Sequence, residues 1–152
     1  MYLDLKNYTT TPIQKLKIIQ LETKAQLKEF NQILVQSFGN PKAFDIIFNK
    51  IPVSAYTNKA PYRFYTGYIN NKAVTTGTLV FHAGVVGIYF IVTLTEERRK
   101  GYATEMMHYL LAIAKKEKQK TAILQASEDG KKIYQKMGFQ ECCIFQEFTL
   151  KK

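Results

Sequence analysis

One short stretch decides how this chain is interpreted: RRKGYAT, residues 98–104. It follows an apolar segment, residues 83–94, and opens an amphipathic helical pattern that continues to about Lys118. The first amide groups of a helix have no partner within the helix and lie at the positive end of its dipole, so together they attract an anion. Gly101 and Ala103 would let an anion approach the backbone without striking a large side chain.

Positive side chains surround this helix start. Each cation there opposes the helix dipole by about a few tenths of a kcal/mol, a cost that a bound anion removes. Arginine can also hold phosphate through two parallel hydrogen bonds. We therefore predict a phosphate site made of seven residues: Arg98, Arg99, Lys100, Gly101, Tyr102, Ala103 and Thr104. The alternative is a basic helical turn that binds nothing.

The segments before this turn predict a meander of strands. Residues 62–69, 73–81 and 85–94 are rich in Tyr, Phe, Val, Ile and Thr, as strands are. Turn residues at 70–71 and 83–84 leave only short connections, which favour antiparallel pairing.

The first sixty residues predict a strand and two helices. Residues 16–21 form the strand, and Thr23 caps a helix that runs from residue 24 to residue 38. The sequence Gly-Asn-Pro at residues 39–41 ends that helix. A shorter helix follows, with one apolar stripe formed by Phe44, Ile47, Phe48 and Ile51.

After the long helix, the pattern predicts a strand at 121–126, a helix at 129–137 and a final strand at 139–150. The expected fold is α/β (α+β): a mixed sheet with helices on both faces. We expect one domain over residues 16–152, preceded by residues 1–15 as an arm or an extra edge strand.

Composition excludes several classes of protein. Of 152 residues, 46% are hydrophobic and 22% charged, which fits a soluble globular chain. No apolar run reaches the roughly 20 residues of a membrane span, and no signal-peptide pattern opens the chain, so we expect a cytoplasmic protein without a membrane partner. Cys142 and Cys143 are neighbours and have no His or Cys at ligand spacing, so neither a disulfide framework nor a metal is expected.

The net charge of +10 would attract any polyanion. Nucleic acid, an acidic membrane surface and a phosphorylated cofactor all satisfy it. A nucleic-acid-binding domain would show steeply salt-dependent affinity, but no nucleic-acid-binding motif is recognisable, so nucleic acid is not an expected partner.

Two motifs resemble the GNAT superfamily of acyl-CoA-dependent N-acyltransferases. Arg98, Gly101 and Ala103 match its R/Q-x-x-G-x-G/A signature, and residues 134–139 match its Y-x-x-x-G-F ending. Residues 87–93 look like the strand that leads into the family's cofactor loop, so the resemblance covers about residues 85–140. The family often has Pro at the place of Thr95 and Gly at the place of Arg99, departures that remove no backbone contact.

The resemblance implies a mostly antiparallel, GNAT-like sheet in which strand 85–93 splays from strand 121–127. Acetyl-CoA would be the co-substrate, its pantetheine arm lying in that gap against backbone groups of Ile91, Val92 and Thr93. One of those amides would stabilise the thioester oxygen during reaction. Ser127 would orient pantetheine or a water, and Tyr134 would act as general acid toward the departing thiolate.

The implied reaction moves the acetyl group from acetyl-CoA to a primary amine by direct attack in a ternary complex. The acceptor is an amine of a small molecule or a peptide, and a homodimer is possible. No carboxylate lies within residues 85–93 to serve as general base; Glu96, Glu97, His82 and a water chain remain as alternatives. A rival hypothesis keeps the fold without the reaction: an acyl-CoA sensor or a partner-binding module.

Overall fold

A six-stranded sheet forms the centre of the computed structural model, which describes residues 1–39, 41–57, 60–146 and 148. The strand order is β1-β6-β5-β4-β3-β2, and every pairing is antiparallel except that of β5 with β6. The strands are β1 (Tyr2–Asp4), β2 (Lys17–Gln20), β3 (Tyr62–Ile69), β4 (Lys72–His82), β5 (Val85–Thr93) and β6 (Thr121–Ile123). This confirms the mixed, mostly antiparallel sheet.

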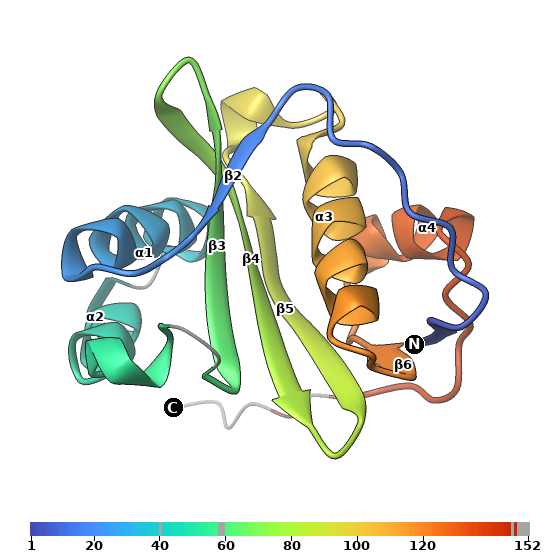
Figure 1. Cartoon of the computed structure of the whole chain (residues 1–152). Helices are drawn as coiled ribbons and strands as arrows, with labels where there is room; N and C mark the ends of the chain where they lie inside the picture. Colours follow the sequence, from blue (N-terminus) through green and yellow to red (C-terminus); the bar gives the residue numbers. More distant parts are fainter. Residues whose placement is uncertain (40, 58–59, 147, 149–152) are drawn as a thin grey trace.

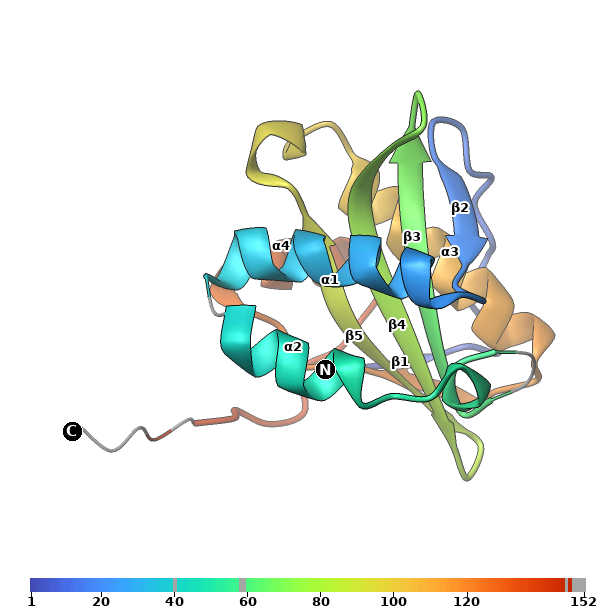
Figure 2. The same cartoon turned by 90° about the vertical axis from the view of Figure 1, so that its left-hand side faces the viewer.

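Helices cover both faces of the sheet (Figure 1). α1 (Lys24–Phe38) and α2 (Pro41–Asn49) lie on one face, and α3 (Tyr102–Lys116) and α4 (Glu128–Lys136) lie on the other. Figure 2 looks onto the α1 and α2 side. Two short 3-10 helices, η1 (Val53–Ala55) and η2 (Thr95–Glu97), follow α2 and β5. Within the described residues, no helix is both long and apolar enough to cross a membrane.

The sheet separates two apolar cores because successive residues of a strand point to opposite faces. On the α3 side, Leu79 and Ile88 pack with residues of α3 that include Met106 and Leu110. The core on the α1 side is built mainly of aromatic rings and branched aliphatic chains; among its members are Phe30, Leu34, Phe48, Phe64, Val92 and Leu94. β5 therefore contributes to both cores.

The capping signals of α1 are confirmed, whereas the stripe of α2 is only partly right. Thr23 and Gln26 form a reciprocal capping box, and Gly39 ends α1 in the left-handed conformation with φ of 67°. In α2 only Phe48 is buried, and Ile47 is 54% exposed. The helix lies at the rim of the α1-side core, so a narrower stripe than predicted reaches that core.

The predicted final strand is wrong over residues 141–146, which form no strand. Phe139 is buried, and Gln140 forms a single bridge with Tyr2, each backbone N–H donating to the other residue's carbonyl at 2.9 and 2.8 Å. β1 already occupies the edge of β6, and it is only three residues long. Residues 147, 149 and 150 of the predicted strand lie outside the described residues.

Candidate cofactor and active site

β5 and β6 run together for only three residue pairs, from Val85–Gly87 to Thr121–Ile123. The strand predicted at 121–126 is thus shorter: its pairing with β5 ends at Ile123, while on its other edge Leu124 still exchanges hydrogen bonds with Met1. Beyond Gly87, β5 has no strand partner on its β6 side among the described residues. This is the splayed strand pair, and it leaves one edge of residues 88–93 available to an extended ligand.

A bulge interrupts β5 within this open segment. Thr76 pairs with Val92 and Thr78 with Tyr89, so Phe90 and Ile91 together oppose the single residue Gly77. Phe90 takes a positive φ of 51°, and its carbonyl accepts a hydrogen bond from Thr76 Oγ1 at 2.8 Å. Because a bulge leaves its extra residue out of the ladder, backbone groups at residues 90–91 are freed from β4.

The turn at residues 98–104 connects η2 to α3 and contains two residues in the left-handed region, Arg99 (φ 61°) and Gly101 (φ 89°). Within the described chain, the amides of residues 99–104 donate no hydrogen bond, and the first helical bond runs from Glu105 N to Gly101 O at 3.0 Å. A Cβ on Gly101 would meet nothing closer than Lys15 Nζ, at 4.0 Å. Unpaired donors and open space suit a phosphate group.

Two of the predicted cations already have protein partners. Arg98 Nε donates to the carbonyl of Thr93 at 3.3 Å, which fixes the end of β5 to the turn. Lys100 Nζ lies 2.7 Å from Glu97 Oε2, and Glu97 also contacts Lys72 at 3.2 Å. Arg99 is exposed and makes no such contact with the described residues.

No pattern in the sequence indicates a further cation at this turn. The chain between β1 and β2 passes the N-terminal end of α3 (Figure 1), and there Lys15 Nζ donates to the carbonyl of Lys100 at 3.1 Å. Glu105, in the first turn of α3, accepts hydrogen bonds from the amides of Lys15 and Leu16, both at 3.1 Å. Lys15 is found at this turn only because the fold brings the segment before β2 next to the start of α3.

Tyr134 lies on α4 and packs against the α3-side core, its ring 6.0 Å from that of Phe139. Its hydroxyl has no hydrogen-bond partner among the described residues, and burial raises the pKa of the phenol. Ser127 is the N-cap of α4, where its Oγ accepts from the Gly130 amide at 3.3 Å. The Ser127 hydroxyl is therefore already used to cap α4.

The candidate bases are poorly suited to accept a proton. Lys100 and then Lys72 lower the pKa of Glu97, while a backbone hydrogen bond and then Lys72 lower the pKa of Glu96. His82 pairs with Val85, at the opposite end of β5 from Thr93. Each observation weakens the case for a carboxylate or histidine base at the turn.

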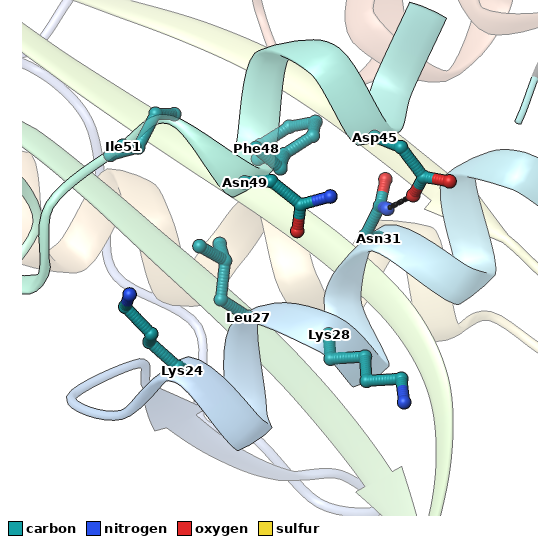
Figure 3. A pocket seen from close by; sticks show the side chains of 8 residues that line it. All are labelled: Lys24, Leu27, Lys28, Asn31, Asp45, Phe48, Asn49 and Ile51. Carbon is teal, nitrogen blue, oxygen red and sulfur yellow. Dashed lines mark hydrogen bonds between the residues drawn. The ribbon is translucent and has the colours of Figure 1, made fainter. Parts of the chain in front are cut away.

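A cavity of about 480 Å³ lies between α1 and α2 (Figure 3). Figure 3 shows the Asn31 amide donating to Asp45, at 2.9 Å, beside Asn49. Phe48 lines the cavity, and its ring centroid is 6.0 Å from that of Phe90. Phe48 therefore stands between this cavity and the bulge of β5.

A metal centre finds no support in the described ranges, where no three His, Cys, Asp or Glu side chains gather as ligands. Cys142 and Cys143 are exposed, with their sulfur atoms 3.8 Å apart.

Comparison with known proteins decides the family. The model of the acetyltransferase (GNAT) domain matches residues 68–142, which include β4, β5, the 98–104 turn and α4. The chain contains a GNAT acetyltransferase domain. GNAT proteins use acetyl-CoA. No curated protein matches the sequence significantly.

Solved structures share the GNAT fold at low identity. A predicted acetyltransferase of Clostridium acetobutylicum, solved with acetyl-CoA, is 20% identical with a TM-score of 0.66, covering 88% of this chain and 96% of its own. Glucosamine-6-phosphate N-acetyltransferase of Arabidopsis thaliana is 20% identical with a TM-score of 0.68, covering 91% and 100%. A Pyrococcus horikoshii protein assigned to the acetyltransferases is 19% identical with a TM-score of 0.71; 88% of this chain matches 46% of that one.

Proposed function

We propose that this GNAT protein is an N-acetyltransferase that moves an acetyl group from acetyl-CoA to a primary amine. One observation carries the proposal: the unpaired amides of residues 99–104 stand at the end of the strand whose free edge, residues 88–93, faces the gap from β6. Diphosphate and pantetheine are joined in acetyl-CoA, so a turn of free amides next to a free strand edge suits both parts.

Each part of the site has a distinct role in binding. The amides of residues 99–104 hold the diphosphate, with Arg99 adding positive charge. Backbone groups of Ile91, Val92 and Thr93 pair with the pantetheine arm. An amide freed by the bulge faces the thioester oxygen and stabilises its negative charge as the amine attacks.

In the chemical step, the attacking amine loses one proton and the leaving thiolate gains one. The amine nitrogen attacks the thioester carbonyl carbon, a C–N bond forms and the C–S bond breaks. The attacking amine loses its proton to a water. Glu96 and Glu97 are weak bases because their pKa values are lowered and both form ion pairs with lysines. Tyr134 gives its proton to the leaving thiolate. A phenol has an ordinary pKa of about 10 and so carries its proton at neutral pH, and burial raises the pKa of Tyr134 further.

The acceptor we propose is an amine of a small molecule or a peptide. A neighbour with the same fold is named for a sugar amine, glucosamine 6-phosphate. Tyr89 and Phe90, 36% and 37% exposed, stand at the bulge and offer apolar surface to the body of the acceptor. Binding the amine and the thioester side by side supplies a large part of the rate.

Thiol release from acetyl-CoA in the presence of an amine panel tests the proposal. Tyr134→Phe should reduce turnover by roughly a hundredfold, the usual contribution of a general acid, while the CoA dissociation constant stays the same. Tyr62→Phe, at a tyrosine that is 51% exposed on β3, is the matched control and should keep full turnover. Undiminished turnover in Tyr134→Phe would remove the tyrosine from the mechanism.

A non-catalytic acyl-CoA sensor is the second candidate, favoured by the ion-paired state of Glu96 and Glu97. A sensor would bind acetyl-CoA without releasing thiol for any amine. The same assay, combined with a binding measurement, separates the two functions.

A further inference from the structure

We propose that Lys15, outside the residues that match the family model, binds the diphosphate of acetyl-CoA. The inference rests on the proposed function and adds a residue from the segment between β1 and β2 to the cofactor site. Its starting point is position: Lys15 Nζ lies 4.0 Å from where a Cβ of Gly101 would be, on the open side of the turn.

The charge of Lys15 is available to a ligand. Its ammonium donates to the carbonyl of Lys100 at 3.1 Å, a neutral partner, and forms no ion pair within the described chain. By contrast, the charge of Lys100 is offset by Glu97 at 2.7 Å, and Arg98 is directed to Thr93. An ammonium has three donors, so Lys15 can keep its bond to Lys100 and still donate to a phosphate oxygen.

The backbone around Lys15 is fixed to the helix that supplies the free amides. Glu105 Oε2 accepts from the amides of both Lys15 and Leu16 at 3.1 Å, and the Leu16 side chain is buried. Glu105 lies in the first turn of α3, so the lysine and the amides of residues 102–104 belong to one connected unit. Less conformational entropy is then lost when the lysine meets its anion.

The geometry assigns Lys15 to the diphosphate rather than to the 3′-phosphate of the cofactor. Gly101 is the N-cap of α3, and an anion at the free amides lies directly over it. A lysine beside Gly101 therefore contacts the same anion as those amides. CoA, dephospho-CoA and pantetheine separate the two phosphates, since the second lacks the 3′-phosphate and the third lacks both.

Isothermal titration of the full chain with these three ligands tests the assignment. Lys15→Gln should weaken binding of CoA and of dephospho-CoA by the same factor, roughly three- to tenfold for an exposed charged contact, and leave pantetheine unchanged. Lys15→Arg should retain most of the affinity. Lys28→Gln, the same change of charge at an exposed position of α1 on the other face of the sheet, should leave all three affinities unchanged.

One further control keeps the outcomes distinct. Hydrogen exchange at the amides of residues 15 and 16 should be the same in Lys15→Gln and wild type, which shows that the segment is still held by Glu105. Equal CoA affinity in Lys15→Gln, or a loss seen with CoA but not with dephospho-CoA, would overturn the assignment. A wild-type protein that binds no CoA would instead overturn the proposed function.

Discussion

His108 shows at the scale of one residue what the sequence leaves hidden. Its helical position suggests an ordinary surface side chain, yet Nδ1 lies 2.6 Å from the hydroxyl of Tyr8, a residue that is 8% exposed. Burial lowers the pKa of His108, and the charge of Glu105 opposes that shift only in part. The contact joins residues a hundred positions apart, so no local pattern predicts it.

The lowered pKa makes stability depend on pH. The unfolded chain binds a proton at His108 near its ordinary pKa of about 6.5, but the folded chain resists it, so the free energy of unfolding should fall as pH drops below about 6.5. His108→Gln should flatten this part of the curve, measured by urea unfolding between about pH 5 and about pH 8. His82→Gln, at an exposed position, is the control; an unchanged slope in His108→Gln would contradict the account.

At the scale of elements, local sequence signals predict the start of a helix well. They do not predict which strands pair at the edge of the sheet. The start of α1 follows from Thr23 and Gln26, which satisfy each other's backbone donors within four residues. β6 and the expected strand at 139–150 depend on partners far away in the chain. Met1 and β1 take the positions beside Leu124 and β6, an outcome that alternation alone cannot indicate.

Removal of the α1 cap should destabilise the protein without changing the residues of the proposed cofactor site. Thr23→Ala loses the hydrogen bond to the Gln26 amide and should lower the free energy of unfolding by about 1 kcal/mol. Thr23→Ser keeps the hydroxyl and should recover most of that loss. Chemical denaturation measures both variants; equal stability of Thr23→Ala and wild type would show that the cap contributes nothing.

At the scale of the whole molecule, the proposed cofactor site is formed by segments that the sequence predicts to different degrees. The 98–104 turn and its position before a long helix were readable, because the motif is contiguous and its chemistry is mostly that of backbone amides. The splay of β5 from β6 was expected only from the resemblance to the GNAT family. The structure shows that the two strands separate after Gly87. The segment that brings Lys15 to the turn required the full three-dimensional arrangement (Figure 1).

The account as a whole depends on free amides at the start of α3 holding the cofactor's diphosphate. A two-dimensional NMR titration of amide resonances with CoA tests this most directly, with pantetheine as the comparison ligand. We predict that CoA shifts the amides of residues 101–104 and of residues 91–93, whereas pantetheine shifts only the second group. Saturation with CoA that leaves the amides of residues 101–104 unmoved would contradict the account.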